Sequence, residues 1–419
     1  MAIPHEPRRL ALLGGTTTWG DCAAALGYLA DPRDLIDGPA IEEYERAFAQ
    51  AIGVRFGFSF SAGRVGLFGL LQALGIGAGD EVLLQAPTHI VVSNAIRYTG
   101  ASPVYVDCRL DSFTIDLEQA ERRITARTRA LLVQHTFGIP VEMDAALGLG
   151  RRYGLVVIED CVHSLGARYA GRPVGGFGKA AFFSTEETKT ISSTMGGMLV
   201  TDDAELAGRL AAFQASCAWP TASLTARYVL KLVLYHLLTQ PRLHRYSRRI
   251  YERIGRRHPL PRPTSREELC GRKPAHYEQR LSNAQAALAL RQLRRLKSNL
   301  RHRAATAQAY AAALSAGPDP PSVPMLGRAA YVRYPLWVRD RAAAVRAASP
   351  HTVLGTWFTS VLEEATTADA GGYANGSCPR AELAAGHLVN LPTHLRVQPQ
   401  DVQAIASSLA GFVSAPTAA

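Results

Sequence analysis

The stretch FFSTEETKTISSTMGG, residues 182–197, combines residue types that can do chemistry. It begins inside an apolar run, KAAFFS, which is typical of a buried strand and ends in Ser184. Lys189 follows five residues later, and a glycine pair closes the stretch. Most lysines are solvated surface charges, so a chemical role for Lys189 requires partners elsewhere in the chain.

Two further segments end apolar strands in polar or glycine residues. GLVVIED ends in Glu159 and Asp160, and a carboxylate there needs a partner because burying it unpaired is costly. A helix cap or a structural ion pair would also satisfy it. FSFSAGRVGL places a glycine turn, Gly63–Arg64, before an apolar helix, and free N–H groups at a helix start suit a phosphate. This turn alone lacks the spacing of a P-loop or a dinucleotide fingerprint.

The three segments together suit one cofactor. Ligands of open parallel sheets bind beyond the carboxyl ends of the strands. Pyridoxal phosphate needs a lysine for a Schiff base, a carboxylate that keeps its ring nitrogen protonated, and donors for its phosphate. The sequence therefore predicts a pyridoxal-phosphate site that contains Lys189 and Asp160.

The elements that position these residues alternate from about residue 40 to 210. Helical periodicity occurs in IEEYERAFAQAIG, DLEQAERRI and DAALGLGRRYG. Continuous apolar runs predict strands buried on both faces: EVLLQAP, SPVYVD, ALLVQHT, GLVVIED, KAAFFS and GGMLVT. This alternation predicts an α/β fold whose large domain has a mixed, mostly parallel sheet covered by helices on both sides.

The remainder of the chain predicts a smaller α/β C-terminal domain. Residues 283–314 are expected to form one long helix or two, YVRYPLWV a strand, NLPTH a loop and QDVQAIASSLAGF a last helix. We therefore divide the chain into three parts. They are an N-terminal segment with the large cofactor-binding domain (1–215), a basic, partly helical excursion (216–275), and the long helix with the smaller domain (276–419).

Charge is concentrated in one segment of the 419-residue chain. The net charge is +11, but residues 227–262 hold ten Lys or Arg and one acid, a balance of +9 that leaves +2 elsewhere. This distribution argues against a nucleic-acid binder. Six scattered cysteines without a CxxC pair argue against a metal site or disulfides and suit a reducing cytosol. No apolar run approaches the about 20 residues that cross a bilayer, so we expect a cytoplasmic protein.

The basic segment, residues 226–262, is predicted to form one or two amphipathic helices. Its simplest interpretation is a solvated excursion whose apolar face packs on the body of the protein. Two functional alternatives remain: weak contact with an anionic membrane, which would make the protein peripheral to it, and a surface for a polyanionic substrate or partner.

The sequence resembles the DegT/StrS family of fold type I pyridoxal-phosphate aminotransferases, the sugar-nucleotide aminotransferases. The resemblance runs from about Gly38 to the last helix. The segments that carry it are GPAIEEYERAFAQAIGV, GIGAGDEVLL, SPVYVDCRLDSFTIDLEQAERRITARTRALLVQHTFGIPVEMDA, VIEDCVHSLGARYAGRPVGGFGKAAFFS and CPRAELAAGHLVNLPTH.

The resemblance implies three catalytic residues. Lys189 stands at the Schiff-base lysine, which then carries a proton between the substrate Cα and the cofactor C4′. Asp160 stands at the carboxylate that pairs with the pyridine nitrogen. His163 stands where the family has Gln or His near the phenolic oxygen of the ring. The alternative is that His163 does not touch the cofactor but supports a residue that does.

The resemblance also implies four cofactor-binding residues. His89 stands where the family stacks an aromatic ring on the cofactor, and a buried core histidine is the alternative. Gly63, Arg64 and Ser184 fall on phosphate-binding positions. Arg64 replaces the family's usual Thr, so it contributes either its backbone N–H alone or also a charge-assisted side-chain contact.

Two further positions depart from the family pattern. The family reaches across a homodimer with an Asn that touches the neighbour's cofactor phosphate, which implies shared active sites. Glu278 stands at that position here, so it either points away or is replaced by another residue. Met195 stands where the family has an acid before the glycine pair, which favours a difference on the substrate side.

The resemblance implies an aminotransferase that moves an amino group, with glutamate the usual donor, to a keto sugar linked to a nucleotide. A sugar dehydratase or other non-transaminating enzyme is one alternative, but the dehydratase branch replaces the lysine by His, and Lys189 is present. A catalytically degenerate regulator or membrane-associated protein is another. The sequence leaves the acceptor and its stereochemistry open.

Overall fold

A mixed seven-stranded sheet forms the centre of the large domain in the computed structural model, which describes residues 8–12, 15–248, 263–314, 327–367 and 370–414. The strand order is β1-β10-β9-β6-β5-β2-β4. Strands β9, β6, β5, β2 and β4 are parallel, and β10 and β1 join antiparallel at one edge. The strands are β1 (Phe56–Phe60), β2 (Glu81–Gln85), β4 (Ser102–Val106), β5 (Thr128–Gln134), β6 (Val156–Asp160), β9 (Ala180–Ser184) and β10 (Gly197–Thr201).

Helices cover both faces of this sheet because alternate strand residues point to opposite sides. Phe182 belongs to the core under α3, α4 and α7, whereas its neighbour Phe183 belongs to the core under α2, α5, α6 and α11. The covering helices are α2 (Ala40–Ile52), α3 (Gly63–Ala73), α4 (Ile90–Arg97), α5 (Leu117–Arg122), α6 (Met143–Tyr153), α7 (Ala204–Ser216) and α11 (Asn283–Leu293). The predicted α/β architecture with a mostly parallel sheet is therefore confirmed.

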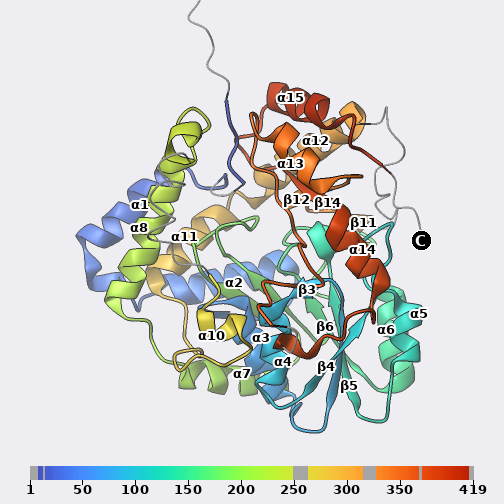
Figure 1. Cartoon of the computed structure of the whole chain (residues 1–419). Coiled ribbons are helices and arrows are strands. Elements are labelled where there is room, and N and C mark those ends of the chain that lie inside the picture. Colours follow the sequence, from blue (N-terminus) through green and yellow to red (C-terminus); the bar gives the residue numbers. More distant parts are fainter. Residues whose placement is uncertain (1–7, 13–14, 249–262, 315–326, 368–369, 415–419) are drawn as a thin grey trace, which may run out of the picture.

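The smaller C-terminal part lies above the sheet in Figure 1 and has its own core, built around β12 (Arg333–Trp337) and β14 (Leu388–Pro392). Its helices are α12 (Leu296–Leu314), α13 (Arg341–Ala348), α14 (Pro379–His387) and α15 (Pro399–Leu409). The helical stretch from residue 283 divides into α11 and α12. Residues 390–392 of the expected NLPTH loop instead belong to β14, because this strand pairs antiparallel with β12, with Asn390 opposite Pro335.

Short elements connect these layers. Strand β3 (Thr88–His89) pairs in parallel with β13 (Leu362–Glu363), which ties the large domain to the smaller one. The other short elements are β7 (Arg168–Tyr169), β8 (Arg172–Pro173), β11 (Gly327–Arg328), η1 (Pro32–Asp34), η2 (Thr136–Gly138), η3 (Ala370–Gly372) and α10 (Arg266–Leu269).

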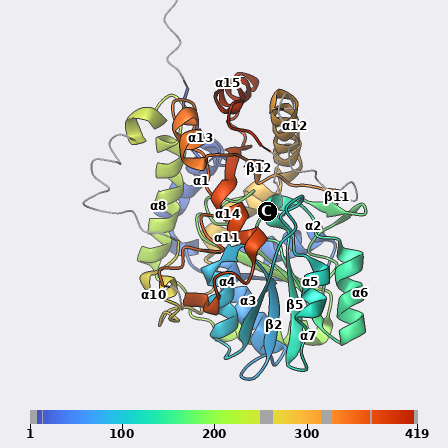
Figure 2. The ribbon, with the colours of Figure 1, turned by 45° about the vertical axis from the view of Figure 1, so that its right-hand side comes forward.

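Helix α8 (Ala222–Leu238) and helix α1 (Trp19–Ala30) pack side by side at one edge of the molecule, away from α5 and α6 (Figure 1; Figure 2). One face of α8 buries Val229, Leu232 and Val233 against α1 and α11. The opposite face, here called the leucine face, exposes Leu230, Leu234, Leu237 and Leu238. The predicted packing of one apolar face on the body therefore occurs, but a second apolar face remains uncovered. Residues 249–262 of the basic segment lie outside the described residues.

Among the described residues, no helix is long and apolar enough to span a membrane.

Candidate functional site

A cavity of about 390 Å³ opens beyond the carboxyl ends of β6 and β9, between the large sheet and the loop 354–358 of the smaller domain. Strand order makes this the expected place for a ligand, because the carboxyl ends of parallel strands meet at one edge of the sheet. All seven residues singled out from the sequence line the cavity: Gly63, Arg64, His89, Asp160, His163, Ser184 and Lys189.

Asp160 is the last residue of β6 and is completely buried. Its Oδ1 accepts a hydrogen bond from the Val162 N–H at 3.0 Å, whereas its buried Oδ2 has no hydrogen-bond partner among the described residues. Burial raises the pKa of Asp160 to about 7, and the Val162 N–H and Lys189 only partly oppose this. A buried carboxylate oxygen without a partner is costly unless a ligand supplies a donor.

Lys189 is only 8% exposed, so it is not a solvated surface lysine. Its Nζ lies 4.4 Å from the centroid of the Trp357 ring. Burial lowers the pKa of Lys189 to about 8; Arg333 also lowers it, while Glu186 and Asp160 raise it. A lysine amine with this pKa exchanges protons near neutral pH and has a substantial neutral, nucleophilic fraction.

His163 lies on the turn after β6 and stacks on Trp357, with ring centroids 4.9 Å apart and planes 24° from parallel. Its Nδ1 accepts from the Phe137 N–H at 3.4 Å. Burial, followed by the nearby Lys189, Arg333 and His89, lowers the pKa of His163 well below its usual value. His163 is therefore a neutral ring at the cavity wall, fixed on one side by a backbone donor.

His89 is not a fully buried core histidine, because its side chain is 26% exposed and lines the cavity. It caps α4: its Nδ1 accepts from the Val91 N–H at 3.3 Å. Its Nε2 lies 3.4 Å from Oε2 of Glu364. These contacts hold the ring at the mouth of the cavity.

The start of α3 packs closely against the end of β9. Gly63 is its first residue, and Ala62 before it offers no side-chain cap. A Cβ at Gly63 would lie 2.7 Å from the carbonyl oxygen of Phe183, so only glycine lets α3 start this close to β9. Ser184 ends β9 beside this helix start, and its Oγ accepts from the Glu186 N–H at 3.3 Å.

The side chain of Arg64 is already paired. Its Nε lies 2.6 Å from Oε1 of Glu268 in α10, and its Nη2 donates to Oε2 of Glu268 at 3.1 Å and to the Pro263 carbonyl at 2.9 Å. Of the two roles expected for Arg64, these contacts favour the backbone N–H as its contribution to a ligand. The side chain instead anchors α10 over the helix start.

The other two residues that depart from the family pattern, Glu278 and Met195, lie in different surroundings. Glu278 does not line the cavity; it forms an ion pair with Lys273, and both side chains are about one-third exposed. Because the family's contact reaches a neighbouring subunit, both expectations for Glu278 remain predictions. Met195 is buried, packs into the core under α3 and also lines the cavity.

Glu159, next to Asp160, has a different and complete set of partners. Its carboxylate contacts His135 Nε2 at 3.1 Å and accepts from the N–H groups of Gly175, Phe177 and Gly178 at 2.7–2.8 Å. Although burial opposes ionisation, His135 and these donors hold the pKa of Glu159 below its usual value. The carboxylate of Glu159 is therefore satisfied by hydrogen-bond donors of the protein, which gives it a structural role, and Asp160 is the carboxylate left for a ligand.

Sequence reasoning missed three residues that shape the cavity. Trp357 and Arg333 both line it, and Lys231 of α8 pairs with Glu187, which lines it too. Arg333 had a usable signal, a single charge inside the apolar strand YVRYPLWV. Trp357 and Lys231 had none, because their partners lie far away in sequence.

Comparison with known proteins gives consistent relatives. The sequence profile of the DegT/DnrJ/EryC1/StrS aminotransferase family matches residues 21–410. A GDP-perosamine synthase from Escherichia coli O157:H7 is 38% identical over 177 residues, 42% of this chain and 49% of the relative. One from Caulobacter vibrioides is 39% identical over 173 residues, 41% of this chain and 47% of the relative. These alignments thus span about half the length of the curated relatives.

The solved structure of S. venezuelae DesV in complex with a ketimine intermediate is similar over most of its length. It is 27% identical with a TM-score of 0.72, and the match covers 94% of each chain. Because the family profile matches nearly the whole sequence, the chain belongs to the DegT/DnrJ/EryC1/StrS aminotransferase family.

Proposed function

We propose that the protein is a pyridoxal-phosphate-dependent aminotransferase that moves an amino group from an amino acid to a keto sugar linked to a nucleotide. The observation that carries this proposal is the buried Oδ2 of Asp160, which has no partner among the described residues and shares a cavity with a buried lysine. Membership in an aminotransferase family supports the reaction class.

The residues of the cavity fit pyridoxal phosphate. Oδ2 of Asp160 would accept a hydrogen bond from the protonated ring nitrogen, and a positive charge there would favour the ionised carboxylate. The N–H groups of Gly63 and Arg64 and the hydroxyl of Ser184 would hold the phosphate at the start of α3. His163 and His89 would border the ring. When bound, the cofactor supplies an electron sink for the substrate carbon.

Lys189 has two tasks in this proposal. Its neutral amine would hold the cofactor through the aldehyde group when no substrate is present, and with substrate bound the amine would move the proton of the substrate Cα. The pKa of about 8 suits both tasks, because the amine can gain or lose a proton near neutral pH. The aromatic ring of Trp357 lies beside the amine at the cavity wall.

The acceptor is proposed to be a nucleotide-linked keto sugar, with glutamate as donor. The GDP-perosamine synthases among the relatives support this substrate class. Mass spectrometry of a panel of keto-sugar nucleotides incubated with the protein and glutamate would show a product carrying nitrogen in place of the keto oxygen. No aminated product from any member would count against this acceptor class.

The spectrum of the purified protein tests the reaction class. A protein with bound cofactor should show a visible absorption band that glutamate removes. The Lys189→Ala variant should lack that band, whereas Lys297→Ala, at an exposed lysine of α12, should keep it. A band that no amino acid removes would favour a non-transaminating enzyme or a regulator over an aminotransferase.

The protein is further proposed to be a cytoplasmic homodimer with shared active sites, as its family membership suggests. Light scattering of the purified protein tests the dimer.

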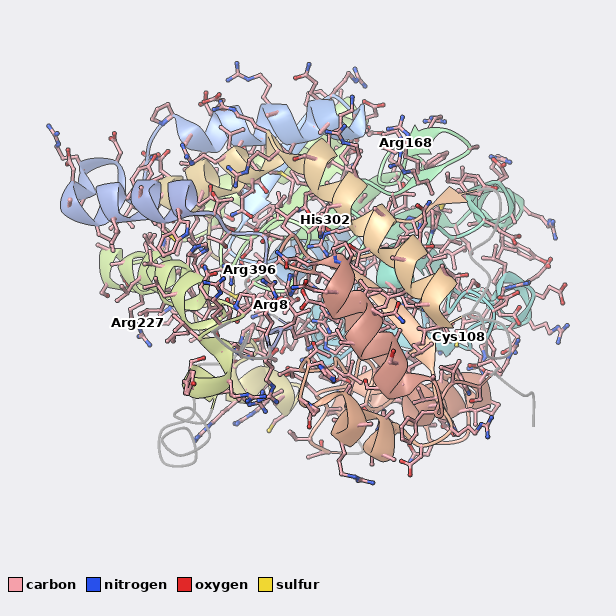
Figure 3. The ribbon with its side chains drawn as sticks, turned by 90° about the horizontal axis from the view of Figure 1, so that it is seen from above. Arg8, Cys108, Arg168, Arg227, His302 and Arg396 are labelled. Atoms are coloured by element: carbon pink, nitrogen blue, oxygen red, sulfur yellow. The ribbon has the colours of Figure 1, made fainter. Side chains whose placement is uncertain are left out.

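We also propose weak contact of the leucine face with anionic membrane. The face carries four exposed leucines on a helix from the basic segment, and Arg227 projects from the outer edge of α8 (Figure 3). Sedimentation with anionic liposomes tests this contact, and protein that stays in the supernatant at both low and high salt contradicts it.

A further inference from the structure

The first turn of α3 carries N–H groups that the helix itself cannot satisfy. Gly63 and Arg64 are its first two residues, so their N–H groups have no acceptor within the helix, and Ala62 before them makes no side-chain cap. All three residues line the cavity that contains Lys189. A helix start of this kind favours an anion in the cavity.

Thr264 lies at the wall of the same cavity, on the segment that leads into α10, and is 6% exposed. Among the described residues its hydroxyl has no hydrogen-bond partner. The hydroxyl of the next residue, Ser265, is used differently: it caps α10 by accepting from the Glu268 N–H at 3.2 Å. A buried hydroxyl without a partner is costly, so its position at the cavity wall indicates a polar ligand.

Contacts on both sides of Thr264 tie it to Arg64. On one side, the carbonyl of Pro263 accepts from Nη2 of Arg64 at 2.9 Å. On the other side, the Ser265 N–H donates to Oε2 of Glu268 at 2.9 Å, and Oε1 of this carboxylate lies 2.6 Å from Nε of Arg64. The Thr264 hydroxyl and the open N–H groups of α3 therefore belong to one part of the cavity.

Glu278 does not offer a comparable donor. The resemblance to the family places a contact with the neighbour's cofactor phosphate at this position, but an ionised carboxylate only accepts hydrogen bonds and repels a phosphate. Glu278 is paired with Lys273 and does not line the cavity. Thr264 brings a hydroxyl to the cavity from within the subunit.

We infer that the hydroxyl of Thr264 binds the phosphate of pyridoxal phosphate, so that the excursion 216–275 completes the cofactor site of its own subunit. The hydroxyl can donate to a phosphate oxygen, as the N–H groups of Gly63 and Arg64 do at the helix start. This inference rests on the proposed function. A phosphate of the nucleotide-linked acceptor has the same chemistry, and the experiment separates the two.

The experiment titrates the cofactor-free protein with pyridoxal phosphate and with pyridoxal, which lacks the phosphate, and follows the visible band. Thr264→Val removes the hydroxyl but keeps the shape of the side chain, and Thr264→Ser keeps the hydroxyl. Thr367→Val, at an exposed threonine that follows β13, is the matched control. Thermal unfolding of each cofactor-free protein shows that the variant folds.

We expect Thr264→Val to weaken the binding of pyridoxal phosphate by at least about tenfold, as for loss of a hydrogen bond to a charged group. Its binding of pyridoxal should match the wild type within about twofold, because pyridoxal has no phosphate to lose a contact. Thr264→Ser should bind pyridoxal phosphate more tightly than Thr264→Val does. Cofactor-free Thr264→Val should unfold no earlier than the wild type, since the hydroxyl has no partner in the protein.

Heterodimers test whether the contact stays within one subunit. The first carries Lys189→Ala on one subunit and Thr264→Val on the other, so that only the second subunit can show the band. It should bind pyridoxal phosphate as weakly as Thr264→Val alone. The second heterodimer carries both changes on one subunit, and its unchanged subunit should bind as the wild type does.

Three results would overturn the inference. The first is unchanged binding of pyridoxal phosphate by Thr264→Val; a slower return of its band with the keto-sugar nucleotide would then assign the hydroxyl to the acceptor phosphate. The second is an equal loss with pyridoxal, and the third is wild-type binding in the first heterodimer, which would place the contact across the dimer. A wild-type protein that shows no band with either compound would overturn the proposed function as well, whereas a variant-specific result bears on Thr264 alone.

Discussion

Lys231 of α8 forms an ion pair with Glu187, two residues before Lys189: its Nζ lies 3.0 and 3.1 Å from the two carboxylate oxygens. The lysine comes from the basic segment, and the glutamate is buried in the loop that carries Lys189. Burial, and then Glu186, raise the pKa of Glu187 to about 7, which Lys231 opposes. Among the described residues, this ion pair thus joins the excursion to the loop that carries Lys189.

Lys231→Met should destabilise the protein because it leaves the Glu187 carboxylate buried without its cation. We expect a loss of about 1–3 kcal/mol in the free energy of unfolding at pH 8, and a smaller loss at pH 6, where Glu187 can take up a proton. Urea unfolding at the two pH values measures this, with Lys297→Met as the control. Equal loss at both pH values would show that the ion pair is not the cause.

Asp160 should make the cofactor-free protein less stable as the pH rises. Its folded-state pKa of about 7 lies above the ordinary 3.8, so between these values the native state holds a proton that the unfolded chain has released. The contribution of Asp160 to the free energy of unfolding is fully present below pH 3.8 and is lost as the pH rises through about 7. The Asp160→Asn variant lacks this pH-dependent contribution.

Thermal unfolding of cofactor-free wild type and Asp160→Asn from about pH 5 to 8 checks this prediction. The wild type should lose stability relative to the variant across the range, whereas exposed Asp34→Asn should follow the wild type. A constant difference between wild type and Asp160→Asn would mean that Asp160 is ionised throughout.

Arg64→Met should weaken the fold but leave the cofactor attached. The variant strips the buried Glu268 carboxylate of its arginine, a loss of about 3 kcal/mol for a broken buried pair. The phosphate contact proposed for Arg64 uses its backbone N–H, which the variant keeps. Exposed Arg266→Met on the same α10 is the control. A stable variant without the visible band would show that the guanidinium contacts the phosphate.

The sequence predicted the parts of the site that belong to one sheet. Asp160 and Ser184 end neighbouring parallel strands, and the turn at Gly63 precedes a helix packed on them, so their meeting follows from strand order. The family resemblance supplied His89 and His163, which no pattern in the sequence alone would have selected. Their assigned contacts with the cofactor remain predictions.

The remaining parts depend on long-range packing. Arg333 and Trp357 reach the cavity only because the smaller domain closes over the sheet, and Asn390 of β14 holds the backbone of Trp357. The NLPTH segment was expected to be a loop, and it contains Asn390 and Pro392, residue types that are depleted in strands. Its pairing with β12 outweighs that local preference.

The most direct test of the central claim is to find which lysine carries the cofactor. The purified protein is reduced with borohydride, which fixes pyridoxal phosphate on its lysine, and its peptides are identified by mass spectrometry. We predict the added mass on the peptide that contains Lys189, and its loss when the protein is first treated with glutamate. Attachment to another lysine, or no attachment in protein that shows the visible band, would contradict the account.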